Sequence, residues 1–294
     1  MLVPVRRDFR FELPANRILD WHSGGRYTTH FLNTLSVFFP VGERFFIESV
    51  RRYRDKVTDP SLKKAVTAFI GQEAMHGREH EEYNEIAQQA GMPVQPQERH
   101  VRHIVWFFLN ILHKRVALYI TMALEHFTAI LAQRVLDDPL TLGDSHPAYK
   151  QLWRWHALEE TEHKAVAYDT WLHTCKPQTL FEKSLGALGH YFLRCGVMLL
   201  VTVGFLMVIS YYWVRHVKAD PIAYRKGYGL LIGGAQLFRF LWLTPGTFRK
   251  ATLDWADYFK PNFHPWQHKN AHHLKELDGF SPTSSEYNIP ATAY

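Results

Sequence analysis

Long parts of the chain place apolar residues three or four positions apart, which is the spacing of one face of an α-helix. This pattern predicts four helical stretches, over about 28–57, 61–90, 98–138 and 148–175. The third stretch is long enough to be two helices. Asp59-Pro60 predicts a helix start, because Asp caps a helix and proline fits its first turn. Alternation of apolar and polar residues is almost absent, so the first 175 residues are predicted to be all-α.

The pattern changes after Pro177. Residues 195–214 read CGVMLLVTVGFLMVISYYWV, without a charge. As a helix this segment would be about 30 Å long, enough to cross a bilayer, and its terminal aromatic residues suit the membrane interface. A second apolar stretch, 228–246, contains Arg239, which is costly in lipid. The region therefore either spans or lies on a membrane, or is buried against the helical core or in a homodimer interface through 195–246.

These patterns divide the chain into four parts. We expect an N-terminal arm, a helical bundle, an apolar helical region that contacts a membrane in one interpretation, and an irregular tail, over 1–27, 28–176, 177–262 and 263–294.

Composition narrows the class of protein. Hydrophobic residues make up 47% and charged residues 21%, as in a folded chain. The net charge of +6 is spread without a dense basic run, so we expect no nucleic-acid partner. Cys175 and Cys195 are too few for a disulfide framework, and the N-terminus lacks an apolar core of signal-peptide length. We expect a cytoplasmic protein, associated with the inner membrane if the apolar region contacts lipid.

Two Glu-x-x-His motifs and two separate glutamates stand out in helical sequence. Each motif places its Glu and His on one helix face, and each separate glutamate lies in strongly apolar sequence. One Glu from each of two helices, with Glu-x-x-His from two others, is the ligand set of ferritin-like carboxylate proteins that hold two iron or manganese ions. The set here is Glu43, Glu73, His76, Glu125, Glu160 and His163.

The spacing of these residues lets them meet at one level of a bundle. The midpoint between Glu43 and Glu73 falls near 58, at the Asp59-Pro60 break, and that between Glu125 and Glu160 falls in the PLTLGD break. Glu73 and Glu125 are further apart than a tight hairpin requires. Residues 91–112 fit a crossover along the bundle, although an up-down bundle stays open.

Four buried carboxylates cost several kcal/mol each unless cations neutralise them. The pattern therefore predicts a dinuclear metal centre whose six ligands are also the catalytic residues. Ligation rich in carboxylates with few imidazoles suits iron or manganese better than zinc or copper. We expect two iron ions, with Mn/Fe or Mn/Mn as alternatives.

Two more histidines lie on the same helix faces. His156 and His80 are predicted as additional metal ligands, with a hydrogen bond to a ligand or plain packing as the alternative roles. Glu79, Glu159 and Glu162 point away from these faces and are expected to be solvated or to hydrogen-bond to ligands.

Three segments carry a family resemblance. LSVFFPVGERFFIESVRRY, FIGQEAMHGREHEEYN and YFKPNFHPW resemble a bacterial family described as a predicted metal-dependent hydrolase, which implies a ferritin-like fold. The metal residues are also similar to those of arylamine N-oxygenases of the p-aminobenzoate-oxidising type. Those enzymes have an additional histidine one turn before the last Glu-x-x-His, the position of His156.

These observations lead to a functional expectation with alternatives. The fold class expected is all-α, a ferritin-like four-helix bundle with a dinuclear metal centre and C-terminal hydrophobic helices. The main hypothesis is an O₂-activating oxidase or oxygenase whose partners are O₂, an apolar or lipid-like small molecule and an electron donor that the sequence does not identify. The alternatives are a dinuclear metal-dependent hydrolase and an iron- or peroxide-handling protein without turnover of an organic substrate.

Overall fold

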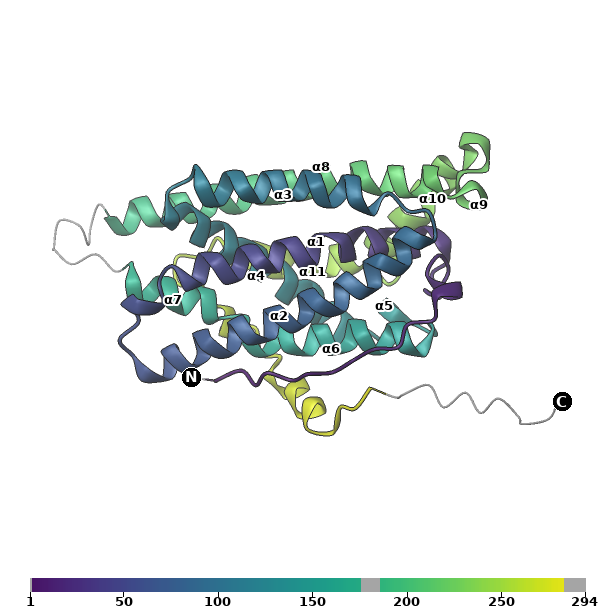
Figure 1. Cartoon of the computed structure of the whole chain (residues 1–294). Coiled ribbons are helices and arrows are strands. Elements are labelled where there is room, and N and C mark those ends of the chain that lie inside the picture. The colour runs from purple at the N-terminus through teal and green to yellow at the C-terminus, as the bar shows by residue number, and fades with distance from the viewer. Residues whose placement is uncertain (1, 176–185, 283–294) are drawn as a thin grey trace.

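The computed structural model describes residues 2–175 and 186–282, and within these ranges the chain is all-α (Figure 1). The fold class predicted from the helical spacing is therefore confirmed. The start of the predicted apolar region, 177–185, and the last residues of the tail, 283–294, lie outside the described residues.

Four helices form the bundle, and a fifth continues the last of them after a break. They are α1 (Arg26–Arg51), α2 (Pro60–Gln89), α4 (Lys114–Asp137), α6 (Pro147–His163) and its continuation α7 (Val166–Thr174). Short turns η1 and η2 and helix α5 lie at the ends of this bundle, over Ala15–Arg17, Arg54–Lys56 and Pro139–Leu142.

The predicted corner between α1 and α2 is confirmed. The Asp59 carboxylate accepts a hydrogen bond from the Leu62 backbone N–H at 2.7 Å, and Pro60 occupies the first helical position. The predicted single helix 148–175 is wrong in one respect, because it is interrupted at Lys164 and Ala165. There the buried Lys164 ammonium donates to the Asn270 side chain and the His268 carbonyl, so the C-terminal tail packs at the interruption.

Helix α3 (Val94–Asn110) forms the connection that the long interval between Glu73 and Glu125 requires. It packs outside α1, where the Gln97 amide donates to the Thr34 carbonyl at 2.9 Å. The chain thereby returns along the bundle, so α4 begins beside the end of α1, where Ser49 and Thr121 share a hydrogen bond. Helices α2 and α4 consequently run in the same direction (Figure 1). The connection between α2 and α4 is therefore a crossover along the bundle and not an up-down turn.

A proline interrupts the hydrogen bonds of α1. Pro40 has no N–H, so the Ser36 carbonyl lacks its usual partner within the helix. The Asn84 amide of α2 donates to this carbonyl at 3.1 Å. The carbonyl that Pro40 leaves without a partner in α1 therefore forms a hydrogen bond to α2.

The C-terminal elements pack around the bundle. They are α8 (Ala187–Ala219), α9 (Pro221–Tyr224), η4 (Arg225–Gly227), α10 (Tyr228–Phe238), η5 (Arg239–Leu243), α11 (Thr247–Asp257), η6 (Pro265–Gln267) and η7 (Ala271–Gly279). Among them, α8 lies on the side where α3 lies, and η7 packs against α6 (Figure 1). Helix α8 packs on α1 and α4, and α11 packs on α4. The apolar region is therefore joined directly to the bundle.

Two helices in the described ranges are long and apolar enough to cross a membrane, by length and composition alone. In α4 67% of the most apolar window is buried, as expected for a core helix, whereas in α8 the share is 22%. Of these two helices, α8 therefore leaves the larger part of its apolar surface uncovered.

The N-terminal arm runs in extended form along α2 and α6 (Figure 1). Backbone N–H groups of Val5 and Phe11 donate to the carboxylates of Glu162 and Glu79, and the Gln72 amide donates to the Val5 carbonyl. The arm is thus fixed by polar groups of both helices.

Candidate metal centre

The six predicted ligands converge from four helices. Glu43 comes from α1, Glu73 and His76 from α2, Glu125 from α4, and Glu160 and His163 from α6, and all are at most 2% exposed.

One group of ligand atoms gathers around His163. Its Nε2 atom lies 3.2 Å from Glu73 Oε1, 3.5 Å from Glu160 Oε1 and 3.8 Å from Glu125 Oε2. Because nitrogen and oxygen ligands lie about 2.1 Å from such a metal ion, these separations fit atoms that share one cation.

A second group lies around His76 and His156, whose rings stack with centroids 4.2 Å apart. Glu160 Oε1 is 3.7 Å from His76 Nδ1 and 3.0 Å from His156 Nε2, and Glu43 Oε1 is 3.8 Å from His156 Nε2. The other oxygen of Glu73 lies 4.0 Å from His76 Nδ1, so this carboxylate faces both groups. The buried ligand atoms form three overlapping groups, each close enough to hold one metal ion, and Glu73 belongs to two of them.

Most of the ligand atoms lack hydrogen-bond partners in the described structure, and the exception is the contact of 3.0 Å between His156 Nε2 and Glu160 Oε1. Both carboxylate oxygens of Glu43, Glu73 and Glu125 are buried without one. The facing ring nitrogens of His76 and His163 also have none. An unsatisfied buried polar group costs about 1–3 kcal/mol, and a charged one costs more. These side chains therefore fit bound cations.

The pKa values of the buried ligand side chains also indicate that the site is stabilised by added positive charge. Burial raises the pKa of Glu43 and Glu73 well above its ordinary value, and neighbouring carboxylates raise it further. Burial likewise raises the pKa of Glu125 to about 8. For His163, burial opposes the charged form, but the Glu160 carboxylate outweighs it and raises the pKa to about 9. Without metal, protons partly take the place of the cations.

In His76 and His163, the ring nitrogen that points away from the ligand carboxylates forms a hydrogen bond to a polar side chain. Gln72 donates through its amide nitrogen to Glu162 at 2.6 Å, so its oxygen is left to accept from His163 Nδ1 at 3.1 Å. His76 Nε2 donates to Glu159 at 3.1 Å. In the neutral rings, the form that binds a cation, these bonds place the free electron pairs on His163 Nε2 and His76 Nδ1, the atoms that face the carboxylates.

The arm connects these two supports. The Arg7 guanidinium lies 3.2 Å from a Glu159 oxygen and 2.9 Å from a Glu162 oxygen. One cation of the arm therefore balances the two carboxylates that orient His76 and, through Gln72, His163.

A chain of hydrogen bonds fixes the ring of His156. Asn84 uses its amide nitrogen on the Ser36 carbonyl, so its oxygen accepts from the Ser36 hydroxyl at 2.8 Å. That hydroxyl must then accept from His80 Nδ1 at 2.9 Å, which leaves His80 Nε2 to accept from His156 Nδ1 at 2.8 Å. His156 is thereby oriented with Nε2 toward Glu160 and Glu43, and this atom lies at hydrogen-bond distance, 3.0 Å, from Glu160 Oε1.

The structure separates the two additional histidines. His156 offers its Nε2 atom to the second ligand group, whereas both nitrogens of His80 are engaged with Ser36 and His156. His80 was expected to be a direct ligand, but it belongs to none of the candidate metal-binding groups among the described residues. His80 bonds His156, the contact expected of the alternative role, and direct ligation by His80 stays a prediction.

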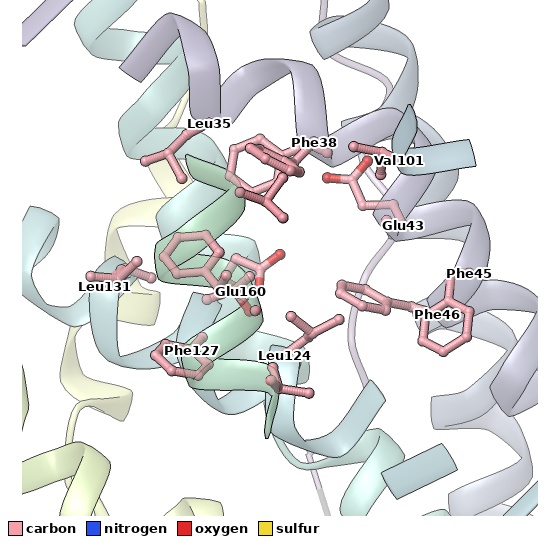
Figure 2. A pocket seen from close by; sticks show the side chains of 18 of the residues that line it. Leu35, Phe38, Glu43, Phe45, Phe46, Val101, Leu124, Phe127, Leu131 and Glu160 are labelled. Carbon is pink, nitrogen blue, oxygen red and sulfur yellow. The ribbon is translucent and has the colours of Figure 1, made fainter. Parts of the chain in front are cut away.

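An apolar cavity of about 600 Å³ borders the centre. Glu43, Glu160 and His156 form its polar wall, and aromatic and aliphatic side chains form the rest (Figure 2). Glu43 and Glu160 extend into the open space from different helices. The cavity volume falls within the range of about 300–1,000 Å³ common for small-molecule sites.

Sequence reasoning missed four residues of this site: Arg7, Gln72, Ser36 and Asn84. Of these four residues, Gln72 could have been noticed in the sequence, because it directly precedes Glu73 of the first Glu-x-x-His motif. The described residues also include a group of Asp137, His272 and His273, which lies at the surface. His264, part of the family-like segment, bonds Asp169 and caps η6, so it anchors the tail.

Comparison with protein families identifies one match that spans residues 5–269. The family is described as a predicted metal-dependent hydrolase. The chain belongs to this family. Membership agrees with the resemblance drawn from the three segments and supports metal ions as cofactors. Comparison with curated proteins and with solved structures gave no significant match, so the ferritin-like relationship of the bundle stays a prediction.

The family corrects the main functional expectation. An oxidase or oxygenase was expected, and the family description supports the hydrolase alternative instead. The physical reason is that ligand type and spacing predict cations but do not distinguish water from O₂ as the reactant. The iron identity was inferred from ligand preference alone and is not shown.

Proposed function

We propose that this protein is a hydrolase that uses two metal ions held between α1, α2, α4 and α6. The observation that carries the proposal is the cluster of buried carboxylate and imidazole atoms without hydrogen-bond partners, next to a cavity. One ion would be held by Glu73, Glu125 and His163, and the other by Glu43, His76 and His156, with Glu160 between them. Ions in such a set polarise the scissile group and provide a nucleophilic water at neutral pH.

The residues of the chain have separate tasks in this proposal. Glu73 and Glu160 would keep the two ions at a fixed spacing, because each lies close to histidines of both groups. His80, Gln72 and Glu159 keep the three ligand rings in the protonation form that can bind a cation.

The apolar wall has a chemical task as well. It keeps bulk water from the reacting groups, which strengthens every electrostatic interaction in the site. Glu43 lies in the polar wall, and burial raises the pKa of its carboxyl group well above the ordinary value. A bound cation holds a carboxylate in its charged form, so this raised pKa belongs to the metal-free site, and Glu43 keeps the ligand role assigned above.

The test is hydrolysis of carboxylic ester and phosphoester probes under anaerobic conditions, with protein loaded with Mn²⁺ or Zn²⁺. We expect turnover without O₂. We expect Glu73→Gln to lower metal content and to reduce the rate by at least about a hundredfold, since removing one ligand affects both ions.

Glu85→Gln is the matched control, because Glu85 is exposed on the same helix. A metal-loaded protein that is inactive on every ester class, or activity that Glu73→Gln leaves intact, would contradict the proposal.

A further inference from the structure

The cavity beside the centre is suited to one kind of ligand. Apart from Glu43, Glu160, His156 and three threonines, the side chains that line it in the described structure are apolar. A polar substrate would lose its hydration there without new hydrogen bonds. A long aliphatic group would instead gain free energy with every methylene that it buries.

The cavity reaches the surface along α8. Its lining residues on this helix follow the spacing of one face, and they are Leu193, Val197, Leu200, Val201, Gly204, Phe205 and Val208. Leu193 and Leu200 line the cavity and are nevertheless 40% and 75% exposed. The opening therefore lies beside these two residues.

Helix α3 forms the other side of this opening. At one end the two helices are joined, because Tyr212 bonds His100 and His216 bonds Gln97. Further along, Ile104 and Phe108 of α3 line the cavity opposite α8. The two helices lie along the same edge of the molecule in Figure 1. The cavity thus opens between them.

The surface around the opening is apolar over a long distance. The exposed apolar side chains of α8 include Leu188, Phe192, Leu199, Val203, Met207 and Tyr211. Those of α3 and the residue that follows it are Trp106, Phe107 and Ile111. Soluble proteins rarely expose so continuous an apolar surface.

Cations flank this surface. Arg215, Lys218, Arg225 and Lys226 are exposed where α8 ends and beyond it. Between residues 187 and 227 the acidic residue is Asp220, which is buried and paired with Arg26 and His30. An apolar face bordered by free cations and by tyrosine is typical of proteins that lie on anionic lipid.

We propose that the cavity binds the aliphatic chain of a lipid ester, which enters from a bilayer through the opening between α3 and α8. The chain would occupy the apolar part, and the ester would lie at the wall formed by Glu43, Glu160 and His156. Hydrolysis then consumes one water, breaks the acyl carbon–oxygen bond and releases an acid and an alcohol, so it needs no further reactant. The ester part of this inference rests on the proposed hydrolase function, and the chain-binding part does not.

Chain binding is tested with saturated fatty alcohols of increasing length, which displace a fluorescent fatty acid from the full-length protein. Alcohols contain no ester, so binding is measured without turnover. We expect affinity to rise about fourfold per methylene until the cavity is full, and then to level off.

A glycine offers a clean way to fill the cavity. A Cβ added at Gly204 meets no atom within 4 Å, and Gly204 lines the cavity. Gly204→Phe should abolish the chain-length dependence. Gly189→Phe on the same helix is the matched control, because Gly189 also has free space but does not line the cavity. Affinity independent of chain length, or unchanged in Gly204→Phe, would overturn the proposal.

Entry from a bilayer is tested by sedimentation with vesicles of phosphatidylglycerol and phosphatidylcholine. The double variant Val203→Asp/Met207→Asp alters exposed side chains outside the cavity and should weaken vesicle binding more than about tenfold. Leu140→Asp, on α5, should not, although Leu140 is similarly exposed. A dimer that the double variant separates, without vesicle binding, would overturn the bilayer part and assign the face to a second copy.

The two proposals fail in different ways. Hydrolysis of short water-soluble esters without alcohol binding would keep the hydrolase and reject the lipid chain. Alcohol binding that Gly204→Phe removes, with no ester hydrolysed, would keep the chain site and reject the hydrolase.

Discussion

At the scale of single residues, His80 is placed to orient His156, a proposed metal ligand, through a hydrogen bond. Its ring lies between the Ser36 hydroxyl and His156 Nδ1. His80→Gln should reduce metal affinity by about 10–100-fold, because the ring of His156 is then no longer held in one orientation. Titration against a competing chelator measures this change.

The number of ions bound distinguishes the two roles of His80. A side chain that only orients His156 leaves two ions per chain at saturation. Loss of one ion in His80→Gln would instead make His80 a direct ligand. His100→Gln serves as a control, since His100 lies on α3 and bonds Tyr212.

The sequence predicts the ligands better than their supports, for a physical reason. Glu-x-x-His has a fixed spacing on one helix, so the motif can be recognised without a structure. Gln72 and Ser36 act across the bundle, and their role depends on side-chain orientation that spacing does not encode. Gly77 is similar: a Cβ there would lie 3.2 Å from Glu43 Oε2, so this helical glycine leaves room for a carboxylate of α1.

At the scale of elements, the arm supports the centre from outside. Arg7→Gln should lower metal affinity at least about tenfold, because Glu159 and Glu162 lose the cation that fixes them behind His76 and Gln72. The chelator titration is made on folded protein and compared with Arg10→Gln, an exposed arm residue. A lower melting temperature with unchanged affinity would show that Arg7 only stabilises the fold.

Element boundaries were largely predictable, whereas element contacts were not. Asp59-Pro60 marks a helix start through local chemistry, and the long interval before Glu125 is long enough for a crossover, although length alone left an up-down bundle open. Lys164, at the interruption of the last helix, bonds the tail, and this contact with residues distant in sequence could not be read from the helical spacing. The arm has no period, so nothing in its own sequence predicts where Arg7 lies.

At the scale of the whole molecule, stability should depend on pH differently with and without metal. Between pH 6.5 and 8 the metal-free fold retains protons on Glu125 and His163, with pKa values of about 8 and 9, that the unfolded chain has released. Its free energy of unfolding therefore falls as pH rises, by at most about 1.4 kcal/mol per pH unit for each proton.

Bound metal displaces these protons, so the loaded protein should lose less stability over this range. The measurement is the melting temperature of both forms from pH 6.5 to 8, and the difference between them should widen with pH. A constant difference would show that metal binding releases no protons.

The cavity and the metal centre share Glu43, Glu160 and His156. If a ligand in the cavity moves these side chains, the affinity of the site for metal ions changes as well. The binding of the ligand and the binding of the ions are therefore thermodynamically linked. Linkage is reciprocal: the factor by which a hydrophobic guest alters retention of the ions equals the factor by which the ions alter retention of the guest. The fraction of the protein that holds metal ions would then depend on the concentration of apolar compounds that bind in the cavity.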